Sequence, residues 1–234
     1  MKVVLFDLDG TLLPMDQDAF VKAYFGALAK TLAPLGYEPN ALIKAVWMGT
    51  MAMVQNQGEK TNEKVFWDTF AGIFGEKVRE DIGYFDAFYC NVFDCVQGSC
   101  GFNEKAGETV RKIKQTGARV ALATNPIFPS IATQKRIAWA GVKPTDFELF
   151  TTYENSRFCK PNVNYYLDIL DKLGVDAKDC LMVGNDVTED MVTQTLGMKV
   201  FLLTDCLINK ENKDISAYPH GGFDDLWAYY QTLL

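Results

Sequence analysis

Histidine is almost absent from this chain of 234 residues, which carries only His220. Any mechanism that needs two histidines is therefore excluded. His220 stands in a glycine-rich loop, where a histidine is usually solvated, and we assign it no role. The six cysteines include no C-x-x-C pair, which argues against a zinc site. We expect free thiols, as in a reducing compartment.

Long apolar runs and an excess of basic residues are also lacking. No window of roughly eighteen consecutive apolar residues occurs, so we expect no membrane span. The first residues show neither a basic region nor a cleavage site, so we expect no secretory signal and a cytoplasmic protein. The net charge is −7, from 23 Lys and Arg against 30 Asp and Glu. Such a charge disfavours binding to nucleic acid or to an anionic membrane, and a phosphorylated substrate would need local positive charge or a metal ion.

What the chain does have is an ordinary globular composition and a distinctive start. Hydrophobic residues make up 48%, enough for one sizeable core, with or without a smaller companion. The stretch Val3–Thr11 places four apolar residues before Asp7 and Asp9, which predicts a buried strand that ends in two carboxylates. Two such groups repel each other and resist burial, so the pair indicates a bound cation or chemistry. The alternative is a surface turn at Asp9-Gly10.

Residues 16–96 show helical periodicity, many aromatic residues and no convincing strand. We expect a small helical core built from four helices. The expected elements are a helix up to Pro34, a helix capped by Asn40, a helix from Thr61 or Asn62 to Gly75, and a helix over 76–94.

From residue 104 onward, strands and helices alternate. The expected helices are 104–116, 129–139, one from Pro161 to Gly174, one ending at Gly197 and one from about Asp224; the expected strands are 119–124, 147–151, 180–184 and 199–203. Alternation of this kind predicts an α/β fold with a parallel sheet and right-handed crossovers. The first strand joins this sheet from before the helical segment, so we predict a core of residues 1–14 and 98–234 with residues 15–97 inserted as a second, helical domain.

Polar residues follow each predicted strand, and the carboxyl ends of parallel strands meet at one edge of a sheet. The side chains expected at this edge are Asp7, Asp9, Thr124, Asn125, Lys160, Asn185, Asp186 and Asp190. Each of these alone has a plain structural explanation. Thr-Asn is a common turn, a lysine before a proline often starts a helix, and Asp186 and Asp190 could be charges at a helix N-terminus. Their joint placement indicates a site.

The chemistry that suits this set is binding of Mg²⁺ and a phosphoryl group. Mg²⁺ prefers oxygen ligands, which the carboxylates of Asp7 and Asp186 and the backbone carbonyl of Asp9 could supply. Asp190 could brace these ligands or accept hydrogen bonds from metal-bound water. Lys160 could bind both a phosphate oxygen and Asp7.

The remaining residues of the set suit transfer of the phosphoryl group itself. Thr124 and neighbouring backbone amides could hold phosphate oxygens, with Asn125 beside them. Asp7 could attack phosphorus to form an aspartyl-phosphate, and Asp9 could protonate the leaving alcohol and later deprotonate the attacking water.

These motifs, in this order, resemble those of the haloacid dehalogenase superfamily. The four motifs correspond to Asp7-Leu8-Asp9-Gly10-Thr11, Thr124-Asn125, Lys160-Pro161 and Gly184-Asn185-Asp186-Val187-Thr188-Glu189-Asp190. Two positions depart from the family's pattern. Val163 stands where many members have a second proline, and Asn185 replaces one acidic residue of the fourth motif, which leaves one fewer carboxylate for a metal.

The resemblance implies a Rossmann-like core with an inserted helical cap, and a Mg²⁺-dependent phosphatase that acts on a small phosphorylated metabolite. Contacts for substrate specificity are expected from the cap, around Gly49-Thr50, residues 56–58 and Met15-Asp16. Gly98 and Gly101 are candidate hinges for closure of the cap. The alternatives are a phosphomutase of the same fold, a 2-haloacid dehalogenase, or a binding protein without turnover. The first would need the same core residues, whereas a dehalogenase would have little use for Asp9, Asp186 and Asp190 together.

Overall fold

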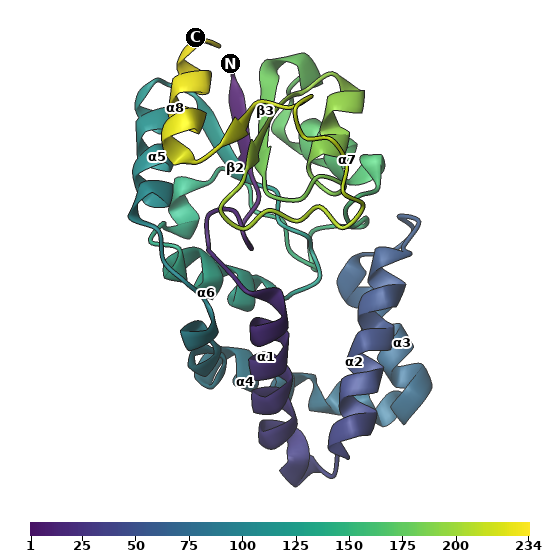
Figure 1. The fold of residues 1–234 in the computed structure, drawn as a ribbon. Helices are drawn as coiled ribbons and strands as arrows, with labels where there is room; N and C mark the ends of the chain where they lie inside the picture. Colours follow the sequence, from purple (N-terminus) through teal and green to yellow (C-terminus); the bar gives the residue numbers. More distant parts are fainter.

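The computed structural model describes all residues 1–234 and contains a five-stranded parallel sheet with helices on both faces (Figure 1). The strands follow the order β2-β1-β3-β4-β5. Their bounds are β1 (Val3–Phe6), β2 (Arg119–Leu122), β3 (Cys180–Gly184), β4 (Lys199–Leu203) and β5 (His220–Gly221). Every strand pair is parallel, so the expected α/β class with a parallel sheet is confirmed.

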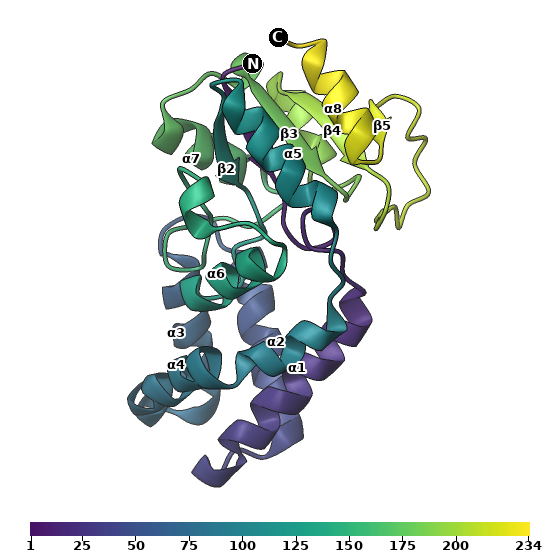
Figure 2. The same ribbon diagram turned by 90° about the vertical axis from the view of Figure 1, so that its left-hand side faces the viewer.

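Four α-helices and several 3₁₀ turns follow β1 and form a helical block over residues 17–99, which lies below the sheet in Figure 1. The helices of the block are α1 (Gln17–Leu32), α2 (Pro39–Val54), α3 (Asn62–Phe74) and α4 (Ile82–Asn91). The helices that follow the block are α5 (Glu104–Gln115), α6 (Ser130–Trp139), α7 (Val163–Leu173) and α8 (Phe223–Gln231). Figure 2 shows that α6 lies between the sheet and the helical block. None of these helices combines the length and apolar character needed to cross a membrane.

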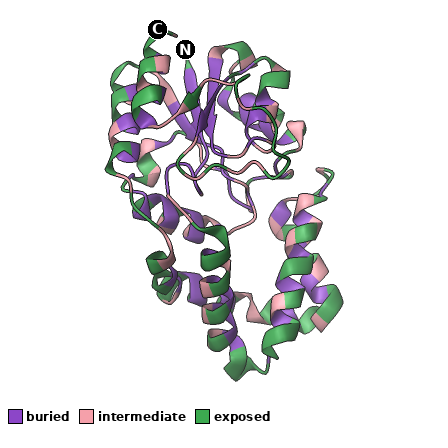
Figure 3. Cartoon of the chain, viewed as in Figure 1, coloured by how far each residue is buried: buried purple, intermediate pink, exposed green.

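The two faces of the sheet are covered by different helices because alternate residues of a strand point to opposite sides. Val4 and Phe6 of β1 pack in the cluster that contains α5 and α8. Val3 and Leu5 pack in the cluster that contains α7. All four side chains are fully buried, and Figure 3 shows β1 among the buried strands at the centre of the sheet. This burial on both faces explains why β1 reads as a continuous apolar run.

Two expected elements are wrong in their type. Residues 147–151 form only a single bridge, between Leu122 and Phe150, and no strand. Three backbone hydrogen bonds join this segment to Val120 and Leu122 of β2. Beyond them, the carbonyl of Thr124 accepts side-chain hydroxyls, from Thr151 at 2.6 Å and Tyr165 at 2.8 Å, in place of a backbone N–H.

The helix expected before Gly197 is a 3₁₀ helix, Met191–Leu196. The preceding turn is held by Asp186, whose Oδ1 accepts the N–H groups of Thr188 and Glu189. Local side-chain bonds of this kind compete with the hydrogen bonds of an α-helix.

Smaller differences concern the ends of elements. The helix expected over 76–94 is divided into a 3₁₀ helix (Glu76–Asp81), α4 and a second 3₁₀ helix (Phe93–Ser99). The second helix begins one residue before Asn40 and is capped by Glu38, which accepts the N–H groups of Asn40 and Ala41. Thr61, one of the two expected residues, caps α3.

Two linkers that run side by side connect the helical block to the sheet. Met15 pairs with Cys100 in an antiparallel bridge, and the N–H of Gly101 donates to the carbonyl of Pro14 at 2.8 Å. The division into a core of residues 1–14 and 98–234 and a cap of residues 15–97 stays a prediction, and these linkers lie at its boundaries.

A second attachment lies at the start of α3. The fully buried Asn62 donates from Nδ2 to the carbonyl of Pro126 at 3.1 Å and to Sγ of Cys159 at 3.3 Å, while its Oδ1 accepts from Asn56 at 2.8 Å. Its backbone N–H also donates to the carbonyl of Ser156. The helical block is therefore bonded to the two sheet-edge loops, around residues 126 and 156–159, that flank the predicted site.

We expect Asn62→Ala to lower the free energy of unfolding by about 2–3 kcal/mol, because it leaves the buried carbonyl of Pro126 without its side-chain donor and removes one of the two acceptors of the Asn56 amide. Chemical denaturation followed by far-UV circular dichroism measures this loss. The matched control is Asn40→Ala at an exposed position, for which a change within about 0.5 kcal/mol is expected. Equal stability of the two variants would contradict this role for Asn62.

Candidate active site

Asp7 lies directly beyond β1, where the backbone is still held by the sheet. Its N–H donates to the carbonyl of Val183 at 2.9 Å. Its carboxylate accepts from Lys160 Nζ at 2.8 Å through Oδ1 and from the Thr11 hydroxyl at 2.9 Å through Oδ2. The side chain is fixed on both oxygens at the end of a rigid strand, which is the placement that a reacting group requires.

Lys160 connects two of the predicted carboxylates. Its ammonium group is 1% exposed and donates to Asp7 and, at 2.6 Å, to Oδ1 of Asp190. The other oxygen of Asp190 accepts the N–H of Asp186 at 3.0 Å. Burial by itself lowers the pKa of Lys160, but the carboxylates of Asp190 and Asp7 outweigh it and raise the pKa above its ordinary value. The lysine therefore stays charged inside the protein.

Asp9 projects from the turn after β1 and is held by a residue that sequence reasoning missed. Its Oδ2 accepts from the guanidinium of Arg136, which is 1% exposed and stacks on Phe128 at 4.4 Å. The other oxygen of Asp9 is buried without a hydrogen-bond partner. Burial raises the pKa of Asp9 above its ordinary value, although Arg136 opposes this shift.

Asn185 and Asp186 follow β3 and make different contacts. Oδ1 of Asn185 accepts from the Thr11 hydroxyl at 3.0 Å, so Asn185 and Asp7 share one donor. Gly10 allows this approach, because a Cβ there would lie 2.3 Å from Nδ2 of Asn185 and the backbone has φ +86°. One oxygen of Asp186, Oδ1, accepts the two backbone N–H groups of the turn that follows it.

Thr124 and Asn125 follow β2, as predicted. Thr124 is 1% exposed, and its carbonyl accepts hydrogen bonds from the hydroxyls of Thr151 and Tyr165. Nδ2 of Asn125 donates to Glu189 at 3.3 Å, whereas its Oδ1 is buried without a partner. Burial raises the pKa of Glu189 to about 7 and that of Asp190 to about 6, with Lys160 opposing both shifts.

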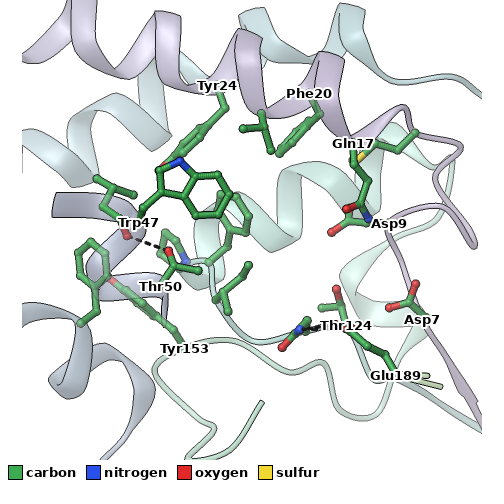
Figure 4. Close-up of a pocket in the computed structure, with 18 of the residues that line it drawn as sticks. Asp7, Asp9, Gln17, Phe20, Tyr24, Trp47, Thr50, Thr124, Tyr153 and Glu189 are labelled. Atoms are coloured by element: carbon green, nitrogen blue, oxygen red, sulfur yellow. Dashed lines mark hydrogen bonds between the residues drawn. The ribbon is translucent and has the colours of Figure 1, made fainter. Parts of the chain in front are cut away.

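A cavity of about 290 Å³ lies between the sheet edge and the helical block (Figure 4). It brings together seven of the eight predicted residues, and Lys160 is bonded to two of them. The lining residues from the predicted set are Asp7, Asp9, Thr124, Asn125, Asn185, Asp186 and Asp190. In Figure 4, Asp7, Asp9 and Glu189 gather on one side of the cavity, and Tyr24, Trp47 and Tyr153 on the other.

Three features of the site did not come from the sequence. Arg136 falls on the buried face of α6 with Ala132 and Ile137, and an arginine at that spacing is the signal that could have revealed it. Glu189 is a third acidic residue in the fourth motif. The helical block contributes mainly aromatic side chains. Of the positions expected to contact substrate, Met15 and Thr50 line the cavity, whereas residues 56–58 do not.

The residues present fit a divalent cation. The sheet end of the cavity is lined by five carboxylates, those of Asp7, Asp9, Asp186, Glu189 and Asp190, while the buried cations beside them are Lys160 and Arg136. Nowhere do three or more His, Cys, Asp or Glu side chains lie close enough together to hold a metal ion by themselves. Magnesium is usually bound by one or two carboxylates together with water and substrate phosphate, so Asp7 and Asp186 are a sufficient pair of side chains.

Fold and site together define an α/β enzyme whose carboxylates and lysine meet at the carboxyl end of a parallel sheet. The family model for haloacid dehalogenase-like hydrolases matches residues 1–192, so the chain belongs to this family and is a hydrolase. The resemblance seen in the motifs is thereby confirmed.

Three similar proteins illustrate the range of the family. The pyrophosphatase PpaX of Bacillus velezensis is 24% identical over 203 residues, which cover 84% of this chain and 80% of that protein. The crystal structure of a HAD phosphatase from Thermococcus onnurineus has a TM-score of 0.61 at 15% identity and covers 98% of both chains. The 2-haloacid dehalogenase of Pseudomonas syringae pv. tomato has a TM-score of 0.66 at 17% identity over 100% of both chains. At these identities the structural matches show the fold and leave the reaction open.

The Asp9–Arg136 pair generates a stability prediction. We expect Arg136→Met to lower the free energy of unfolding by about 3 kcal/mol, because it leaves a buried carboxylate without its partner. Asp9→Asn combined with Arg136→Met should cost less than the sum of the single changes by about 1 kcal/mol or more. Urea denaturation of the four proteins measures this coupling.

The control for the pair is Arg111→Met on the exposed side of α5, which should change stability by less than about 0.5 kcal/mol. Additive single effects, or an Arg136→Met variant as stable as the Arg111→Met variant, would show that the two residues are not coupled.

Proposed function

We propose that this chain is a Mg²⁺-dependent phosphatase that hydrolyses a small phosphomonoester through an aspartyl-phosphate on Asp7. The observation that carries the proposal is the fixed carboxylate of Asp7, held by Lys160 and Thr11 at the end of β1, with Asp9 lining the same cavity. The fold supports the same conclusion, because ligands of open α/β sheets bind at the carboxyl ends of the strands.

The chain's own residues have distinct parts in this reaction. Asp7 attacks phosphorus, and the bond to the alcohol oxygen breaks. Asp9 gives that oxygen its proton and later takes a proton from the water that attacks the phosphorylated Asp7. Asp9 lines the cavity together with Asp7, which suits this exchange of a proton with the leaving alcohol and the attacking water.

The other residues bind and orient the phosphoryl group. Lys160 offers its charge to a phosphoryl oxygen as well as to Asp7. Thr124 and Asn125 line the cavity and supply further donors. Magnesium would be held by Asp7, Asp186 and the backbone carbonyl of Asp9, with Asn185 and Asp190 supporting these ligands. Its positive charge would offset the repulsion between the phosphoryl oxygens and the five carboxylates.

The alternatives fit the site less well. A dehalogenase attacks carbon and has no alcohol to protonate, so the acidic residues beyond Asp7 would be unused. A binding protein without turnover would not need the intact set of Asp7, Asp9, Lys160 and Asp186. A phosphomutase would use the same core residues, and only its product distinguishes it.

We expect release of free phosphate from an aryl phosphate in the presence of Mg²⁺, loss of that activity on chelation, and its return when Mg²⁺ is restored. Asp7→Asn should lower the rate by about 10³-fold or more, because it removes the nucleophile. The matched control, Asp18→Asn at an exposed position of α1, should retain the rate of the unmodified protein. Phosphate release by colorimetry and the mass of the trapped phosphorylated protein are the measurements.

Three outcomes would speak against the proposal. Hydrolysis of a 2-haloacid that survives chelation would indicate a dehalogenase. Conversion of a sugar phosphate to its isomer without free phosphate would indicate a mutase. Undiminished phosphatase activity of Asp7→Asn would remove Asp7 from the mechanism.

A further inference from the structure

The part of the cavity that faces the helical block differs in chemistry from the sheet edge. Fifteen of the 28 lining residues of the cavity are hydrophobic. Figure 4 shows Tyr24, Trp47 and Tyr153 on this side, opposite Asp7 and Asp9. Since Asp7 reacts at the phosphoryl group, the aromatic side receives the alcohol portion of the substrate, and we call it the leaving-group chamber.

The chamber offers little to a second anionic group. Lys210 is the one basic residue that lines the cavity, and it follows Ile208, whose backbone pairs with Asp186 at the sheet edge. Asp86 of α4 also lines the cavity. Burial raises the pKa of Tyr153, and the nearby carboxylates of Glu154, Glu63 and Asp86 act in the same direction. A second phosphate or a carboxylate on the substrate would therefore meet negative charge and aromatic faces.

The size of the cavity limits the leaving group. Its volume is about 290 Å³. A cavity of about 150 Å³ in a protein core is enough to bind benzene. The space thus suits a phosphoryl group together with one ring, and it lies at the lower end of the range of roughly 300–1,000 Å³ for ligand sites.

One buried donor in the chamber is not satisfied by the chain. The Nε1 of Trp67 is buried without a hydrogen-bond partner, and the side chain is 5% exposed. The Tyr153 hydroxyl lies close to this N–H, but the two do not form a hydrogen bond of normal geometry. By contrast, the hydroxyls of Tyr24 and Tyr89 are bonded to each other at 2.8 Å. A buried donor without a partner is costly, so this one marks the place of an acceptor from a ligand.

We propose that the chamber selects monoesters of an uncharged, single-ring aromatic alcohol whose ring carries a hydrogen-bond acceptor for Trp67 and Tyr153. Substrates with a second anionic group, such as pyrophosphate or phosphoglycolate, are rejected. This inference rests on the proposed phosphatase activity and adds its substrate class. Trp67 and Tyr153 are then residues that determine specificity.

The test compares benzyl phosphate, the three isomeric pyridylmethyl phosphates, pyrophosphate and phosphoglycolate by kcat/KM with Mg²⁺. We expect benzyl phosphate to exceed both competitors, which carry a second anionic group, by about tenfold or more, and one pyridyl isomer to exceed benzyl phosphate by about tenfold. In Trp67→Phe and in Tyr153→Phe the preference for that isomer over benzyl phosphate should fall to about twofold or less. Tyr84→Phe, at an exposed position outside the cavity, is the matched control and should keep the preference.

Pyrophosphate or phosphoglycolate hydrolysed as well as benzyl phosphate would overturn the inference and leave the phosphatase proposal standing. An isomer preference unchanged in both cavity variants would remove Trp67 and Tyr153 from the proposal. If no ester were hydrolysed, the proposed function would fail, and binding of the free alcohols by calorimetry would still decide the chamber's chemistry. Tighter binding of one pyridylmethanol than of benzyl alcohol, lost in Trp67→Phe, supports the inference, and equal binding overturns it.

Discussion

The buried ammonium group of Lys160 is the interaction on which the site depends. A charge that is 1% exposed is tolerated only where opposite charge and hydrogen bonds replace water, and Asp7 and Asp190 supply both. Asp7 lies after β1, Lys160 before α7 and Asp190 after β3, so one ion triad joins three segments that are far apart in the chain. Neither carboxylate could be buried here without the lysine, and the lysine could not be buried without them.

Glycine makes the close approach around this triad possible. A Cβ at Gly184 would lie 2.1 Å from Oδ2 of Asp190, so any other residue at the end of β3 would displace the carboxylate that Lys160 needs. Gly10 has the same effect on the opposite side, where it lets Asn185 reach Thr11. The glycines of the short motifs around the aspartates are thus needed for close packing, just as the aspartates are needed for chemistry.

Much of the core site could be predicted from sequence because its residues follow buried strands directly. Strand ends are marked by the change from apolar to polar residues, and parallel strands bring their ends together whatever the details of the crossovers. Arg136 could not be predicted in this way, since it comes from the middle of a helix and its partner Asp9 is distant in sequence. The irregular segments 147–151 and 187–196 were missed for a related reason. There the hydroxyls of Thr151 and Tyr165 and the carboxylate of Asp186 take over hydrogen bonds that local propensity assigns to the backbone.

Overall shape says little about which reaction this hydrolase performs, because a phosphatase and a dehalogenase both match the fold over nearly the whole chain. The difference must come from what surrounds the nucleophile. An attack on carbon needs one carboxylate, whereas five acidic side chains at one end of a cavity repel each other in their charged forms, and a bound cation relieves this repulsion. Lys160 and Arg136 are each already paired to these carboxylates, so negative charge remains in excess. A divalent cation bound among these groups would offset the excess and give an anionic phosphoryl group a positive partner, and this is the physical reason to favour phosphate chemistry at Asp7.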